Sequence, residues 1–172
     1  MKEILTIDFY DYQDSWNIIK REAAKGVIFI NGKLIMLQSR LGDLKFVGGG
    51  MEKDETPMDC LIREVMEETG YLVIRETIKE LGIVTERRKD TYEDAIWEMT
   101  TYLYYCQIDK EQQKDLQLTD SEKEQGMNYI LSTPYEAIQV NTNALKQENC
   151  NPWVYRELEI LKHLFKNELV NK

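Results

Sequence analysis

Apolar residues near the start of the chain gather in short runs, and two of these runs predict a β-hairpin. Residues 23–30 and 33–38 are separated only by Asn31 and Gly32. Both of these residues tolerate positive φ angles, and Asn-Gly between two strand-like runs is a strong hairpin signal. We therefore predict two antiparallel strands joined by a two-residue turn.

A periodic segment over residues 57–69 predicts a helix. Thr56 is suited to cap its first turn, Pro57 suits the first helical position, and Gly70 suits the position just after the last turn. These three residues define both ends of the helix before any tertiary contact is considered.

The side chains of this helix divide into two sides at about 100° per residue. Its apolar residues share one broad sector, which we expect to be buried: Leu61, Val65, Met58, Ile62 and Met66. Glu64, Glu67 and Glu68 gather on the opposite side, with Cys60 near them. Like charges so close together destabilise a helix slightly, unless a hard cation such as Mg²⁺ or Mn²⁺ lies among them. The acidic side therefore predicts a metal site.

The remaining pattern predicts further strands, followed by helices. Strands are expected over 74–88, 96–108 and 127–131, a polar loop with a helical turn over 109–125, and helices over 134–139 and about 152–167. The last helix is amphipathic, because apolar residues recur near helical spacing at Val154, Leu158, Leu161 and Phe165. This order indicates an α/β protein in which helices cover a sheet.

Composition narrows the class of protein. The 172 residues contain no linker or repeat, so we expect one domain over 1–172. The formal net charge of −9 argues against a broad nucleic-acid-binding face and against docking on an anionic membrane. Three widely spaced cysteines and one histidine exclude a disulfide scaffold and a zinc knuckle. The sequence shows neither a signal peptide nor a membrane span, so a cytoplasmic location is expected.

A spaced motif surrounds the glutamates. Its fixed residues are Gly49, Glu55, Arg63, Glu64, Glu67, Glu68 and Gly70, in the spacing G-x5-E-x7-R-E-U-x-E-E-x-G-U. This motif is the Nudix box, here over residues 49–71, and the chain resembles a Nudix hydrolase of the MutT/Nudix-like type. Tyr71 replaces the usual aliphatic residue, Val47 a frequent proline and Asp54 a frequent glycine. These departures leave the carboxylates intact.

The resemblance implies an α/β/α sandwich with a mixed sheet between helices. It also implies Mg²⁺- or Mn²⁺-dependent hydrolysis of a diphosphate linkage in a nucleoside diphosphate joined to another group. The implied metal site comprises Glu64, Glu67, Glu68, Glu52 and Gly49. Arg63 is implied to orient the box glutamates together with Glu55. The general base is left open among Glu68, Glu67 and a distant acid such as Glu122 or Glu124, with a preference for the box.

An anionic substrate requires local cations and, for a nucleobase, a stacking surface. The candidates for substrate contact are Arg40, Arg87, Arg88, Tyr92 and Trp97. Each has a plainer interpretation, as a solvated strand end for the arginines and as sheet core for the aromatic residues.

Three alternatives stay open at this stage. The same site suits a (d)NTP pyrophosphohydrolase that removes non-standard nucleotides from the pool. A Nudix domain that binds nucleotides without cleaving them is disfavoured by the complete carboxylate set, and mRNA decapping by the net charge. The expected partner is a small nucleotide or nucleotide conjugate. The C-terminal helix serves either a homodimer or packing on its own sheet.

Overall fold

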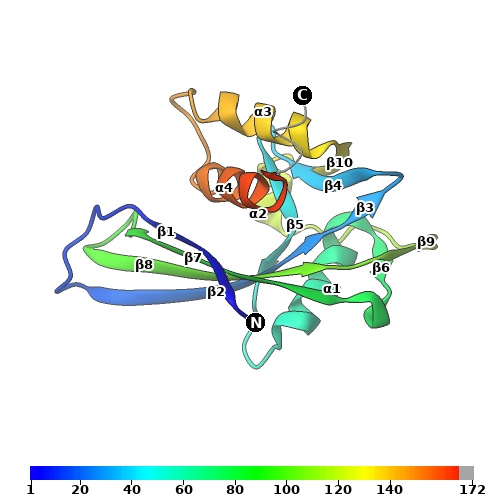
Figure 1. Ribbon diagram of the computed structural model, residues 1–172, viewed down its shortest axis with the longest axis horizontal. Helices are drawn as coiled ribbons and strands as arrows, with labels where there is room; N and C mark the ends of the chain where they lie inside the picture. Colours follow the sequence, from blue (N-terminus) through cyan, green and yellow to red (C-terminus); the bar gives the residue numbers. More distant parts are fainter. Residues whose placement is uncertain (167–172) are drawn as a thin grey trace.

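A computed structural model of the chain, in which residues 1–166 are described, shows a mixed sheet between helices (Figure 1). The strands are β1 (Glu3–Asp8), β2 (Asn17–Val27), β3 (Phe29–Ile30), β4 (Lys33–Gln38), β5 (Leu44–Gly50), β6 (Tyr71–Val73), β7 (Lys79–Lys89), β8 (Ala95–Tyr105), β9 (Ile108–Gln113) and β10 (Asn128–Ser132). The helices are α1 (Pro57–Thr69), α2 (Asp120–Glu124), α3 (Pro134–Ala144) and α4 (Val154–Leu164). α1 covers one face of the sheet, and α3 and α4 cover the other, as the expected sandwich requires.

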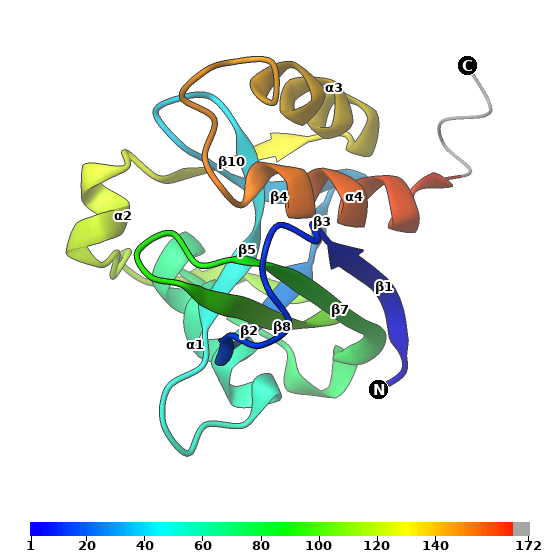
Figure 2. The same cartoon turned by 90° about the vertical axis from the view of Figure 1, so that its left-hand side faces the viewer.

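The large sheet has the strand order β1-β7-β8-β2-β5-β4-β10. The pairs β1–β7 and β2–β8 are parallel, whereas the other pairs along this path are antiparallel. Figure 2 shows β5 between the β4–β10 half and the β7–β8 half of the molecule. Residues 44–46 of β5 pair with β4, and residues 47–50 pair with β2. β5 therefore joins the two halves.

Buried side chains complete the hydrogen bonding of β5 where it passes from one partner strand to the other. The side-chain amide of Asn141 accepts from the Leu44 N–H and donates to the Leu44 carbonyl, both at 2.8 Å. The Phe46 N–H donates to Glu157 at 2.9 Å, and the Phe46 carbonyl accepts from Lys25 at 3.3 Å. Unpaired backbone groups are costly inside a protein, so α3 and α4 hold this strand in place.

The predicted central helix is confirmed, and the predicted hairpin is confirmed around its turn. Of the first run expected over 23–30, residues 23–27 belong to β2 and pair with β8 and β5 instead of β4. β3 and β4 pair antiparallel on either side of Asn31 and Gly32, whose φ angles are 51° and 78°. α1 spans residues 57–69, with the Thr56 side chain accepting from a first-turn N–H and Gly70 in the left-handed conformation at φ 75°.

Other boundaries differ from the sequence predictions. The strand expected from residue 74 begins at Lys79, because Arg75–Thr77 form a 3-10 turn, and the polar segment after 108 contains β9. β1 and β5 are not predicted from sequence, and the glycines of β5 have low strand propensity. Met127–Leu131 corresponds to β10, the helix expected over 134–139 continues to Ala144, and the last helix is α4. Residue 167 of its expected range lies outside the described residues.

The prediction that the apolar side of α1 is its buried side is confirmed for Leu61 and Val65, which are both 0% exposed, but the opposite, acidic side is buried as well. Glu64 and Glu68 are only 8% and 1% exposed, and Cys60 is buried, whereas Met58, Ile62 and Met66 are half-buried. The glycines of β5 leave room for the helix to approach with its glutamates facing inward. The acidic side of α1 is therefore part of the interior.

The apolar side of α4 packs within its own chain. Val154, Leu158, Ile160 and Leu161 are buried, and the last three belong to the core that α4 shares with α3 and the sheet. This contact accounts for the apolar spacing of the helix without a second copy of the chain. Across residues 1–166, we find no helix with the length and apolarity that a membrane crossing requires.

Candidate metal centre and substrate cavities

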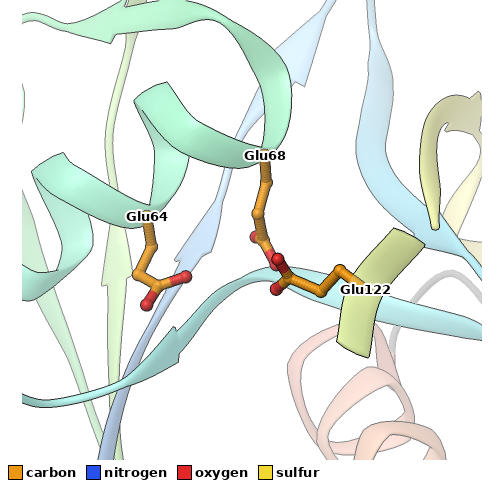
Figure 3. A group of neighbouring side chains, drawn as sticks. All are labelled: Glu64, Glu68 and Glu122. Carbon is orange, nitrogen blue, oxygen red and sulfur yellow. The ribbon is translucent and has the colours of Figure 1, made fainter. Parts of the chain in front are cut away.

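Three carboxylates from two helices meet beside β5. Glu64 and Glu68 lie one turn apart on α1 and project toward Glu122 of α2 (Figure 3). One oxygen atom from each of the three lies within 4.8 Å of the other two. An all-oxygen donor set of this kind suits a hard divalent cation such as Mg²⁺.

Glu122 is the distant acid of the three, and the start of α2 fixes its side chain. Its carboxylate accepts from both the N–H and the hydroxyl of Thr119 at 2.8 Å, while the Thr119 hydroxyl accepts from the Glu122 N–H. This capping box holds the glutamate in one conformation. Glu124, the other distant acid considered from sequence, is exposed and lies outside the group.

Glu68 has the most constrained environment of the three. One carboxylate oxygen accepts from the Gly48 N–H at 2.6 Å, and the other lies 3.4 Å from the Lys45 ammonium group. That second oxygen is buried and has no hydrogen-bond partner among the described residues. Burial raises the pKa of Glu68 to about 8, and burial also raises the pKa of Glu64. Because a buried anion without full compensation is unfavourable, the group fits a bound cation.

Arg63 ties the remaining box residues together. Its guanidinium donates to both oxygens of Glu55 at 2.9 Å, to Glu64 at 2.7 Å and to Glu67 at 3.1 Å. The hydrogen bonds from Arg63 lower the pKa of Glu55 to about 2. Glu67 thus faces Arg63 and lies outside the three-carboxylate group, in which Glu122 takes the place that the sequence prediction gave to Glu67.

Glycine is required at two positions of β5. A Cβ atom on Gly49 would lie 2.5 Å from the Glu64 carboxylate, so any side chain there displaces a member of the group. Gly48 has a φ of 129°, and a Cβ atom on it would lie 2.2 Å from the Ala24 carbonyl. Glu52, also predicted at the metal site, is exposed on the following loop, where its N–H donates to Glu55.

Cys60 is buried against the end of β5, where its thiol contacts the carbonyls of Gly49 and Gly50, and it is expected to be unreactive. Burial raises the pKa of its thiol to about 12. Cys106 is also buried, with a pKa of about 12, whereas Cys150 is partly exposed. We expect iodoacetamide at pH 8 to alkylate Cys150 first and to spare the other two in the folded protein. Peptide mass spectrometry checks this order, and early labelling of Cys60 would contradict its burial.

The residues predicted to contact substrate do not all come together. Arg88 lies over Trp97, with its guanidinium carbon 4.1 Å from the centre of the ring. Arg87 donates to Glu98, whereas Tyr92 is 95% exposed on the β7–β8 loop. Arg40 is exposed next to the end of α2, where its N–H donates to the Gln125 carbonyl. Only Arg88 and Trp97 form a common surface.

Two cavities flank the region. The larger, about 620 Å³, lies between the first half of β2 and the loop after β5, and its lining includes Arg21, Glu22, Gly50, Glu52 and Glu55. The smaller, about 200 Å³, is lined by Glu86, Arg88, Trp97, Met99, Pro152, Trp153 and Arg156. Met99 lines both cavities.

Arg156 and Trp153 are not among the residues predicted from sequence to contact the substrate. The Trp153 ring does donate to Asp43 at 2.9 Å, but it also faces the smaller cavity. A signal for the buried charges of α4 was available. Glu157 falls on the same helical side as Val154, Leu158 and Leu161, and a charge on an apolar side indicates a buried ion pair.

Comparison with known proteins agrees with this geometry. The NUDIX domain model matches residues 20–153. The solution structure of the E. coli ORF135 protein is similar with a TM-score of 0.50 and 16% identity, covering 92% of this chain and 96% of that one. A NUDIX hydrolase from Nitrosomonas europaea is similar with a TM-score of 0.55 and 16% identity, covering 86% and 91%. A search of curated protein sequences finds no match. The chain therefore belongs to the Nudix family and is, in general terms, a pyrophosphohydrolase that acts on phosphoric anhydrides.

Proposed function

We propose that this chain catalyses the Mg²⁺-dependent hydrolysis of a diphosphate linkage in a nucleoside diphosphate joined to another group. The observation that carries the proposal is the three-carboxylate group of Glu64, Glu68 and Glu122. One Glu68 oxygen is buried 3.4 Å from Lys45 and has no hydrogen-bond partner in the described part of the chain. An acidic protein binds an anionic diphosphate only where positive charge is supplied locally, and a cation among these carboxylates supplies it.

Glu64, Glu68 and Glu122 would hold the Mg²⁺ or Mn²⁺, with Glu67 at the edge of the group and Gly49 leaving space for it. A divalent ion there supplies electrostatic stabilisation of the charge that develops on the phosphate oxygens, and it lowers the pKa of water. Arg63 keeps Glu64 and Glu67 in place through its hydrogen bonds. A box carboxylate, Glu67 or Glu68, accepts the proton of the water that attacks phosphorus.

The cavities favour a conjugated nucleotide over a free triphosphate. Gly50 and Glu55 line the larger cavity, and both accept hydrogen bonds from Arg63, which contacts Glu64. The smaller cavity lies on the Glu68 side, because the Lys45 ammonium is 3.4 Å from Glu68 and 6.0 Å from the Trp153 ring. A substrate with one group on each side of its diphosphate fits this arrangement.

The direct test is the release of nucleoside monophosphate, separated by anion-exchange chromatography, from a panel of nucleotides and nucleotide conjugates with Mg²⁺ or Mn²⁺; a conjugate also yields the phosphorylated second group, and a free triphosphate yields pyrophosphate. Glu122→Gln keeps an acceptor for the capping box but removes the charge, so we expect a loss of about 10-fold or more in kcat/KM. Glu124→Gln, two residues further on and exposed, serves as the matched control and is expected to retain activity.

Equal activity of the two variants would remove Glu122 from the proposed site. Cleavage of free triphosphates in preference to all conjugates would favour a pool-sanitising enzyme. Binding of the panel without turnover under either metal would contradict the proposed activity and indicate a nucleotide sensor.

A further inference from the structure

The cationic side chains beside the three-carboxylate group are not equally available to a ligand. The Arg63 guanidinium donates to three glutamates and to a backbone carbonyl. The Lys25 ammonium, whose charge also acts on Glu68, is 4% exposed, pairs with Glu157 at 2.8 Å and donates to the Phe46 carbonyl at 3.3 Å. Both of these cations are therefore held by groups of the protein itself.

Lys45 of β5 is held more loosely. Its ammonium group lies 3.4 Å from the buried Glu68 oxygen, and that oxygen has no hydrogen-bond partner in the described part of the chain. The contact is therefore an ion pair without a hydrogen bond. The same ammonium group lies 6.0 Å from the centre of the Trp153 ring, and the Lys45 side chain is 16% exposed. A lysine has three rotatable donors on a flexible stem, so it can change its partner.

A divalent ion held by Glu68 changes the balance of charge around Lys45. In the metal-free protein, the ammonium group offsets the negative charge of Glu68. Once Glu68 binds a divalent ion, the ammonium group faces a second positive charge at short range, and two like charges so close together repel each other. An anion that contacts both cations removes this repulsion and is attracted by both.

We propose that Lys45 pairs with Glu68 in the metal-free protein and with a phosphate oxygen of the substrate once the metal is bound. The identity of this anion rests on the proposed function. In the metal-loaded protein, the ammonium group donates charge-assisted hydrogen bonds to the diphosphate. Lys45 is thus a substrate-binding residue that lies outside the motif of residues 49–71.

Binding of Mn²⁺ alone tests the pairing of Lys45 with Glu68. Lys45→Met removes a positive charge close to the bound cation, so titration calorimetry at pH 8 is expected to show Mn²⁺ binding about 3-fold or more tighter than in the wild type. Lys45→Arg keeps the charge and is expected to stay within about 2-fold of the wild type. Lys33→Met is the control, since Lys33 is exposed at the start of β4, and it is expected to retain the wild-type affinity.

Methylenediphosphonate, a diphosphate analogue that is not hydrolysed, tests the contact with phosphate. At one fixed, saturating concentration of free Mg²⁺, Lys45→Met is expected to bind this probe about 10-fold more weakly than the wild type. Lys45→Arg is expected to recover most of the affinity, and Lys33→Met to retain all of it. Without Mg²⁺, the wild type is expected to bind the probe far more weakly, because Lys45 then pairs with Glu68 and the carboxylates repel the anion.

Lysine acetylation of the wild type gives a measurement that needs no variant. In the presence of Mg²⁺, methylenediphosphonate is expected to slow the reaction of Lys45 with acetic anhydride and to leave that of Lys33 unchanged, as measured by peptide mass spectrometry. Circular dichroism shows whether the variants are folded. If Lys45→Met does not fold, the acetylation rates decide whether Lys45 contacts the probe.

Unchanged affinity of Lys45→Met for methylenediphosphonate overturns the proposal, as does wild-type binding of the probe that is equally tight without Mg²⁺. Unchanged or weaker Mn²⁺ binding by Lys45→Met overturns the pairing with Glu68 that the proposal requires. If the probe binds through Lys45 but no member of the nucleotide panel is cleaved, the assignment of Lys45 stands and the proposed function fails. If conjugates are cleaved and Lys45→Met has the wild-type kcat/KM, only the assignment of Lys45 fails.

Discussion

Replacement of Glu68 by glutamine is expected to lower kcat/KM by about 100- to 1,000-fold, the loss seen when one preorganised electrostatic group of a transition state is removed. Glutamine still accepts the Gly48 N–H, which donates to Glu68 at 2.6 Å, so the backbone of β5 is retained. What is lost is the charge on the buried oxygen beside Lys45. Metal-dependent hydrolysis measured under saturating Mg²⁺ checks this result.

In the absence of metal, the same variant is expected to make the folded protein more stable than the wild type at alkaline pH. The pKa of Glu68 is raised by burial to about 8 in the folded state, from an ordinary value of 4.5. The folded state therefore holds the proton more tightly than the unfolded state. The stabilisation that this gives is complete below pH 4.5 and is lost as the pH rises through 8. Thermal melts without metal are expected to show the wild type losing stability relative to Glu68→Gln across this range.

At pH 8, added Mg²⁺ is expected to raise the melting temperature of the wild type to that of Glu68→Gln or above. The melting temperature of the variant is expected to remain nearly unchanged. A wild type and a variant with parallel melting profiles, with and without Mg²⁺, would show that Glu68 is not the buried carboxylate of a metal site. Turnover near the wild-type rate would contradict its part in the reaction.

Glu157→Gln is expected to lower the free energy of unfolding by about 3–5 kcal/mol, because it leaves the ammonium group of Lys25 buried without its anion. The two side chains are 4% and 0% exposed and lie 2.8 Å apart. Urea denaturation followed by circular dichroism measures the change. Glu159→Gln, on the same helix and paired with Lys162 at a partly exposed position, is the control and is expected to cost less than about 1 kcal/mol.

A double variant separates the charge from the geometry of this pair. Lys25→Met combined with Glu157→Gln removes the orphaned ammonium group and is expected to be more stable than Glu157→Gln alone. If the double variant is instead as unstable as the sum of the two single variants, the pair acts through its separate hydrogen bonds to Phe46 rather than through its charge.

The parts of this protein that are predictable from sequence are those decided by local chemistry. Asn31 and Gly32 define a turn by their φ angles, and Thr56 and Gly70 define the ends of α1, so these elements follow from neighbouring residues alone. The motif around Glu64 and Glu68 likewise points to the carboxylates before their positions in space are known.

What depends on distant segments is not predictable in this way. Glu68 is buried because α1 lies close to the glycines of β5. The spacing of residues along a helix does not indicate such a contact with another strand. Glu122 joins the carboxylates from 54 positions beyond Glu68, through a short helix in a polar segment. Arg156 and Trp153 reach the cavity from the C-terminal part of the chain, and their spacing carries no sign of their neighbours on β7 and β8.

The hydrogen bonding of β5 has a consequence for the order in which this enzyme becomes competent. Gly48, which donates to Glu68, belongs to β5. The backbone N–H groups of Leu44 and Phe46 in this strand donate to Asn141 and Glu157, which lie 97 and 111 positions further along the chain. Contacts over such separations form late, after local turns and helices. During synthesis, a nascent chain that already contains the whole Nudix box therefore still lacks Asn141 and Glu157. Without these two residues, β5 is not held in the position in which Gly48 contacts Glu68.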